Sequence, residues 1–363
     1  MYYVKRRVIC KEREMSKSME VTEQSSQKLN LRSRPLAATI ILVLGSFTVL
    51  FGLALSISVG AADIKLSTVW EAIFRFNPDV TQHSIIQELR LPRSLADIMV
   101  GASFSVAGAI MQGMTRNPLA DPGILGINAG AAFMLAFCFA FLPGISYNSL
   151  ILFSFLGAAL ATGLVYGTGF LVRNGLTPVR LVLAGTAVSA LLMALSEGIA
   201  IHFKLSQDLA FWRAGGVAGV KWEQVTTMFP WVVAALVGAL LLSRSITLLS
   251  FGDEVATGLG QRTKPAKLFG AIIVLVLAGV AVSIVGPIAF VGLIIPHLTR
   301  YFVGIDYRWI IPCSAVLGSL FMLLADIGAR MINPPYETPI SALFALIGVP
   351  FFLYVARKEG REL

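Results

Sequence analysis

Long apolar segments constrain this chain more than any other feature. Ten of them follow one another between residues 35 and 355, and each is long enough for an apolar helix to cross the hydrocarbon core of a bilayer. Hydrophobic residues make up 56% of the chain and charged residues 13%, which excludes a water-soluble globule. We therefore predict an all-α polytopic membrane protein with about ten transmembrane helices, over residues 35–60, 93–111, 126–142, 149–172, 181–203, 226–242, 268–286, 287–303, 309–327 and 339–355.

Positive charge along the connections predicts the topology. With an even number of spans and the N-terminus inside, 21 of the 29 Lys and Arg residues fall on the inner side. We expect both termini in the cytoplasm of a bacterial cell, with a polar and disordered tail over 1–34, a transmembrane domain over 35–357 and a short tail over 358–363. The net charge of +9 is spread among loops, so membrane lipid is the expected partner of the basic residues and nucleic acid is not.

No pattern in the chain indicates catalysis or a metal site. A phosphate-binding Gly-x-x-x-x-Gly-Lys followed by Ser or Thr is absent, as are a Ser/His/Asp arrangement and HExxH. The histidines and cysteines lie far apart, without metal or redox spacing, at His83, His202, His297, Cys10, Cys138 and Cys313. We expect no enzyme activity, no cofactor and no bound metal in this chain.

The stretch from residue 90 to residue 131 carries the most distinctive motifs. Pro92 suits a first helical turn, so we expect the second membrane helix to begin at Arg93, after a polar external loop over 61–89 with a short amphipathic piece at 70–76. The helix should stop where Asn117-Pro118 and Asp121-Pro122-Gly123 break it twice. Two membrane helices are thus joined by a turn that contains two helix-breaking sites.

This stretch resembles the FecCD-type permeases of ABC importers, which carry ferric siderophores, haem and cobalamin. The similar motifs are an RLPR start, an NPLADPGILG turn, and three later stretches at 252–260, 286–297 and 346–352. The resemblance covers roughly residues 36–357 and implies a type II ABC importer permease. It also implies a second permease, identical or related, two ATPase subunits and an extracytoplasmic binding protein.

The resemblance assigns a role to the hydrophilic connection over 243–267. Read alone, its short small-residue helix is an ordinary capped surface helix. In the family, this loop docks into a cleft of the ATPase subunit, which implies ATPase coupling for Gly252, Asp253, Glu254, Ala256, Thr257, Gly258 and Gly260.

Three outer arginines and one inner turn complete the predicted sites. Arg90, Arg93 and Arg330 could anchor helix ends in lipid headgroups, whereas the resemblance implies docking of acidic residues of the binding protein. The family also implies a pathway along the helices over 181–203 and 339–355. Its inner gate would lie at Thr177, Pro178 and Val179.

Two alternatives remain open on sequence grounds. An ion-driven secondary transporter would place acids at the midplane, but we interpret Asp97 and Asp326 as helix-end partners of Arg93 and Arg330, four residues away. Within the family, ferric siderophore is the expected cargo and haem or cobalamin the alternative. At Ser341, where the family leads us to expect glycine, we expect a slightly poorer helix contact.

Overall fold

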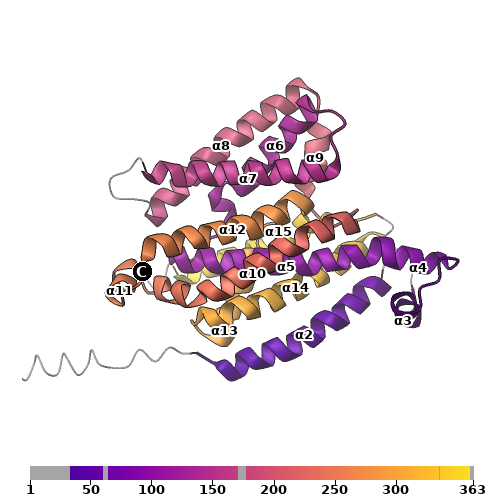
Figure 1. Ribbon diagram of the computed structural model, residues 1–363, viewed down its shortest axis with the longest axis horizontal. Coiled ribbons are helices and arrows are strands. Elements are labelled where there is room, and N and C mark those ends of the chain that lie inside the picture. Colours follow the sequence, from indigo (N-terminus) through magenta and orange to yellow (C-terminus); the bar gives the residue numbers. More distant parts are fainter. Residues whose placement is uncertain (1–32, 60–63, 171–176, 335, 360–363) are drawn as a thin grey trace, which may run out of the picture.

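The computed structural model describes residues 33–59, 64–170, 177–334 and 336–359 as a helical bundle without a β-strand in that part of the chain (Figure 1). Eight helices are long and apolar enough to cross a membrane, and two shorter apolar helices, α6 and α13, bring the number to the ten predicted segments. The elements are α2 (Pro35–Ser58), α3 (Leu66–Phe74), α4 (Thr81–Ile85), η1 (Ile86–Arg90), α5 (Leu91–Thr115), η2 (Pro122–Leu125), α6 (Ile127–Phe141), α7 (Tyr147–Phe170), α8 (Pro178–His202), α9 (Ser206–Ala214), α10 (Trp222–Ser250), α11 (Asp253–Gly258), α12 (Thr263–Val285), α13 (Val291–Val303), α14 (Tyr307–Ile332) and α15 (Ile340–Glu359).

Helix α5 is the centre of the bundle, and small residues allow its backbone to approach its neighbours closely. A Cβ atom added to Gly101 would overlap the carbonyl of Gly318 on α14, and one added to Gly108 would overlap the carbonyl of Gly292 on α13. In a membrane, where lipid is as apolar as a leucine side chain, such van der Waals contact is a main source of helix association. The apolar α5 sequence is therefore a packing surface along most of its length.

The connection between α12 and α13 shows how a helix break is stabilised. The chain leaves α12 at Gly286, and the Gly216 N–H donates a hydrogen bond to the Val285 carbonyl at 2.7 Å. Pro296 lies inside α13 and cannot donate to the Gly292 carbonyl, which instead accepts from Gln112 Nε2 at 3.1 Å. The break expected near Pro287 is present, whereas Pro296 breaks no helix.

Two predicted boundaries differ most from the structure. The second membrane helix does not begin at Arg93, because helical structure runs on from Thr81 through the π-helical turn η1. The Leu91 N–H reaches the Ile86 carbonyl in that turn, so Pro92 enters without ending the helix. Helix α10 continues eight residues past the predicted end at 242, since its hydroxyls bond to carbonyls of the same helix and Ile246 and Leu249 are buried.

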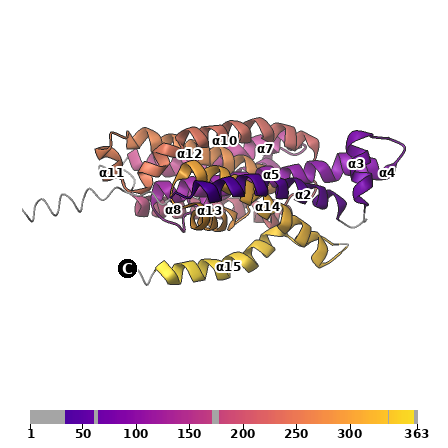
Figure 2. The same cartoon turned by 90° about the horizontal axis from the view of Figure 1, so that it is seen from below.

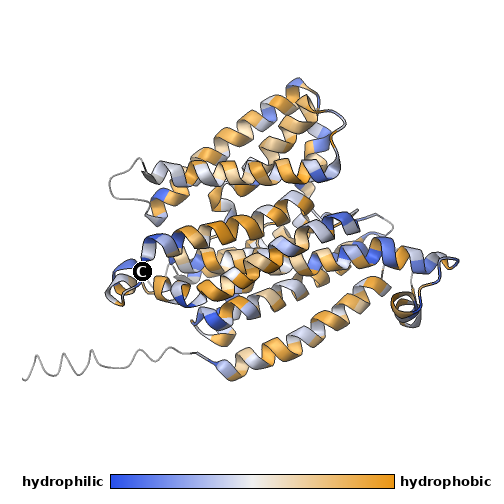
Figure 3. Cartoon of the chain, viewed as in Figure 1, coloured by the Kyte–Doolittle hydropathy of each residue, from blue (hydrophilic) through white to orange (hydrophobic). Residues whose placement is uncertain are grey.

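Different helices lie at the two ends of the bundle. The start of α2, the end of α15 and α11 lie at one end, and α3 and α4 lie at the other (Figures 1 and 2). Apolar residues dominate the helices, and hydrophilic residues gather toward the two ends (Figure 3). Most of the predicted tails, 1–32 and 360–363, lies outside the described residues.

Coverage varies strongly among the spanning helices. In the most apolar window of the span that contains α5, 83% of the residues are buried, against 22% for α8 and 22% for α15. Helix α15 leans away from the bundle in the side view (Figure 2). Helix α2 is covered even less, with 17% of its window buried, so three apolar helices leave most of their residues incompletely buried in the isolated chain.

Candidate coupling, docking and gate sites

Helix α11 lies at the end of the bundle where the chain enters and leaves (Figure 1). It begins after Gly252, whose φ of 117° favours glycine, and Asp253 and Glu254 lie in its first turn, where carboxylates interact well with the helix dipole. Ala256 is buried, and Asp253 also accepts an ion pair from Lys267 at 2.6 Å. Residues of α11 itself thus fix its position against the bundle.

Three further residues predicted to couple to the ATPase are Thr257, Gly258 and Gly260. The two glycines face open space, and Thr257 bonds within the short helix. A Cβ at Gly258 or at Gly260 would meet no atom within 4 Å, and the Thr257 hydroxyl donates to the Asp253 carbonyl at 2.7 Å. Gly258 and Gly260 therefore leave a surface that another protein can approach closely.

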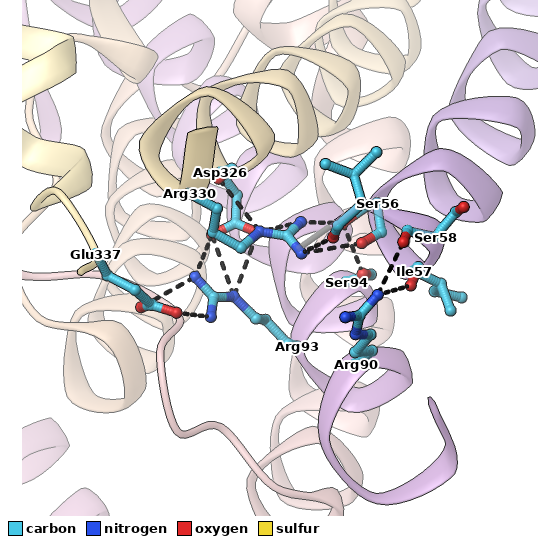
Figure 4. Close-up of polar contacts among 10 residues, drawn as sticks. Ser56, Ile57, Ser58, Arg90, Arg93, Ser94, Asp326, Arg330 and Glu337 are labelled. Carbon is cyan, nitrogen blue, oxygen red and sulfur yellow. Dashed lines mark hydrogen bonds and ion pairs between the residues drawn. The ribbon is translucent and has the colours of Figure 1, made fainter. Parts of the chain in front are cut away.

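The predicted docking arginines come together at the opposite end, where α2, α5 and α14 meet (Figure 4). Arg93 on α5 binds two carboxylates at once. Its Nη2 lies 2.7 Å from Asp326 Oδ1, and its Nη1 lies 2.5 Å from Glu337 Oε1. Asp326 is fully buried, whereas the Glu337 side chain is 43% exposed.

The other two arginines bind backbone carbonyls at the end of α2. Arg330 donates to the Ser56 and Val59 carbonyls at 3.0 and 2.8 Å, and its Nη2 also pairs with Asp326 Oδ2 at 2.9 Å. Arg90 Nη1 donates to the Ile57 and Ser58 carbonyls at 2.6 and 2.9 Å. The last carbonyls of a helix have no partner within it, so both guanidinium groups cap α2.

This capping role escaped the sequence analysis. Arg330 lies 274 residues from Ser56, and no local pattern reports a contact over that separation. The Arg330 side chain is only 8% exposed, and the Arg93 side chain 14% exposed. Of the two, Arg93 alone is paired with an exposed carboxylate.

A comparison with known proteins identifies the family. The model of the FecCD transport family matches residues 48–358, which is most of the chain. This chain belongs to the FecCD transport family. It is therefore a membrane-spanning permease component of ABC importers, not an enzyme and not an ion-driven secondary transporter.

Relatives and a solved structure agree with the FecCD assignment. The chain is 55% identical over 339 residues to the iron(3+)-hydroxamate import system permease protein FhuB of Bacillus subtilis, covering 93% of this chain and 88% of that protein. It is 35% identical over 289 residues to FhuG, a permease protein of the same named system in that organism, covering 76% and 84%. An inward-facing metal-chelate type ABC transporter shares the fold, with a TM-score of 0.77 and 30% identity over 88% of this chain and 99% of that one.

Acidic residues in the spans of this FecCD permease follow the predicted pairing only in part. Asp326 pairs with Arg330 on the next helical turn, as expected. Asp97 does not pair with Arg93, which binds Asp326 and Glu337 instead. Among the described residues, both carboxylate oxygens of the fully buried Asp97 have no hydrogen-bond partner. Glu197 on α8 pairs with Arg213 on α9 at 3.0 Å, near the surface.

The predicted inner gate lies at the start of α8. Thr177 is the N-cap residue, and its hydroxyl accepts from the Arg180 N–H at 3.4 Å. Pro178 occupies the first turn, and Val179 is exposed. Residues 171–176, which complete the predicted turn, lie outside the described part of the chain.

Two remaining expectations concern α15 and metals. The Ser341 hydroxyl donates to the Ala214 carbonyl, so this serine ties α15 to α9. Within the described residues, no group of three or more His, Cys, Asp or Glu side chains is placed to hold a metal ion.

Proposed function

We propose that this FecCD permease imports ferric siderophores of the hydroxamate class, delivered by a binding protein and driven by ATP hydrolysis in separate subunits. The carrying observation is the 55% identity to FhuB over 93% of the chain, since a permease this similar along its whole membrane domain is expected to take the same class of cargo. FhuB is a hydroxamate permease by name. Haem and cobalamin stay the alternatives within the family.

The FecCD family assignment and the paired hydroxamate permeases FhuB and FhuG support a dimer with a second permease, and the sparse coverage of α8 and α15 leaves surface for it. Both helices expose large apolar side chains along their length, such as Leu183, Leu191 and Leu346. Such surface suits either lipid or the facing helices of another permease. We assign α8 and α15 to the translocation pathway between the two permeases, with Thr177, Pro178 and Val179 at its inner gate.

Helix α11 is the proposed contact with an ATPase subunit, and two such subunits would serve the permease pair. Gly258 and Gly260 present no Cβ atoms there, and Asp253 in the first turn pairs with Lys267, which holds α11 in place on the bundle. This assignment places the α11 end, and with it both termini, in the cytoplasm. Arg90, Arg93 and Arg330 then lie on the outer side, where we propose that acidic residues of the binding protein dock.

Radioactive iron uptake tests the proposed cargo. A strain that lacks its own hydroxamate permeases receives this chain with its partner permease, ATPase and binding protein. Uptake of a ferric trihydroxamate is expected, with little uptake of ferric citrate, and growth on haem or cobalamin should not depend on the chain. Equal uptake of ferric citrate, or no uptake of the trihydroxamate, would overturn the assignment.

A further inference from the structure

The ion pair between Arg93 and Glu337 connects the proposed docking surface with the start of α15. Glu337 lies in the segment that leads into α15, and Arg93 belongs to α5 in the packed centre of the bundle (Figure 4). The start of α15 is also packed, because Ile340 and Phe344 are buried in the core, so the ion pair acts together with these contacts. The Thr338 N–H donates to the Ala329 carbonyl at 3.2 Å, and the Ser341 hydroxyl donates to the Ala214 carbonyl.

Asp326 and Glu337 bind overlapping parts of the Arg93 guanidinium group. Nε and Nη2 donate to Asp326 at 2.7 to 3.3 Å, whereas Nη1 donates to Glu337 at 2.5 Å and Nη2 also donates to Glu337 at 3.2 Å. A guanidinium group is planar and always charged, and its N–H groups can bind two carboxylates side by side. One carboxylate can therefore be exchanged while the other stays bound.

Exposure decides which carboxylate is exchangeable. Asp326 is fully buried, and removing one partner of a buried ion pair is strongly destabilising. Glu337 is 43% exposed, and an ion pair with a solvated partner is worth little. A cavity of about 250 Å³ adjoins the pair and is lined by Arg93, Glu337, Phe211 and Val217, among others. A carboxylate from outside has room to approach here.

We propose that Glu337 occupies the place on Arg93 that an acidic residue of the binding protein takes on docking, so that docking removes this tie between α5 and the segment that leads into α15. This inference rests on the proposed function, in which Arg93 faces the binding protein and α15 lines the pathway. The exchange leaves the number of ion pairs at Arg93 unchanged. Its effect is mechanical. The incoming carboxylate belongs to another protein, so Glu337 no longer ties the start of α15 to α5.

Binding measurements test the exchange on the complete transporter in lipid nanodiscs. Glu337→Gln removes the competing charge, so the binding protein that supports uptake should bind about two- to five-fold more tightly, with the gain shrinking at high salt. Glu337→Asp keeps the charge and should stay near the wild-type affinity. Glu223→Gln is the matched control, since it removes an exposed charge at the start of α10 that no arginine binds in the described structure.

Spin labels test the release of α15 separately. Cysteines replace the exposed Tyr336 and Leu89 in a variant without the native cysteines. The distance distribution between the labels should broaden in Glu337→Gln without binding protein, and in the wild type when the binding protein is added. Glu223→Gln should leave it unchanged.

The outcomes separate this inference from the proposed function. If the wild type binds its binding protein but Glu337→Gln matches Glu223→Gln in affinity, the exchange is overturned and docking stands. If Glu337→Gln leaves the label distances unchanged, Glu337 does not hold α15. If the wild type binds no binding protein, the docking assignment and the exchange both fail, and the label distances in Glu337→Gln still decide what holds α15.

Discussion

Helices α5 and α8 are apolar spans of the same length, yet they have opposite environments. Both run for 25 residues and both contain glycine. On α5, Gly108 lies against the backbone of α13. On α8, Gly185 lies against the Ile124 carbonyl in the first half of the helix, whereas a Cβ at Gly198 would meet nothing within 4 Å. Apolar character alone therefore does not tell a packed helix from one whose partner is lipid or another subunit. The contacts of its small residues do.

Gly108→Val should give the largest effect. The new side chain would overlap the Gly292 backbone, which cannot move aside without separating α5 from α13. Overpacking usually costs about 1–3 kcal/mol, and a clash with backbone should exceed that, so we expect loss of folded permease. The measurement is the yield and melting temperature of the monodisperse protein in detergent. Gly198→Val is the matched control and should remain folded; equal losses would remove the contrast between α5 and α8.

Asp326→Asn should give the next largest effect. It leaves Arg93 and Arg330 without their shared buried carboxylate, and breaking a buried ion pair costs about 3–5 kcal/mol. We expect a markedly lower melting temperature, measured in detergent. Asp79→Asn makes the same chemical change at an exposed position near the same end and should have little effect. A stable Asp326→Asn protein would show that the cluster does not hold α5 and α14 together.

Gly258→Arg tests an open surface of another kind, on α11. The arginine has space in the isolated chain, so the permease should fold normally. A bulky cation in a close protein contact should prevent co-purification of the ATPase subunits and abolish uptake. Gln261→Arg adds the same side chain just beyond α11 and should weaken the complex less. Normal co-purification with Gly258→Arg would exclude α11 as the ATPase contact.

The substitution Asp306→Asn, at the start of the packed helix α14, should change stability least. The Asp306 carboxylate accepts a hydrogen bond from the Arg308 N–H at 3.0 Å. Burial disfavours the charged carboxylate and by itself would raise the pKa of Asp306. The hydrogen bonds and the positive charge of Arg308 outweigh burial and hold this pKa below its usual range. The stabilisation is therefore present above the ordinary aspartate pKa of about 4 and is lost as the pH falls further. Asp306→Asn should make the melting temperature fall less steeply between pH 5 and pH 3. The corresponding loss of unfolding free energy is about 1 kcal/mol or less. An unchanged pH profile would contradict this.

Local patterns predicted the spans well and their contacts poorly. The amphipathic piece near Trp70 appears as α3. Such a helix follows from residue spacing along the chain. The partners of Arg93 lie 233 and 244 residues away, and the continuation of the helix through Pro92 depends on a π-helical turn without a sequence signature. Both depend on tertiary structure, so the docking arginines were predicted as a group but not their internal partners.

The long separation between Arg93 and Asp326 also has a consequence in time. A ribosome makes α5 first and must add 233 residues before the carboxylate that neutralises Arg93 exists. The same holds for Gln112, whose two acceptor carbonyls on α13 follow 180 and 181 residues later. An unpaired guanidinium or amide is costly in hydrocarbon. Until α13 and α14 are made, Arg93 and Gln112 need water or another partner, so these final contacts of α5 form only after most of the chain has been synthesised.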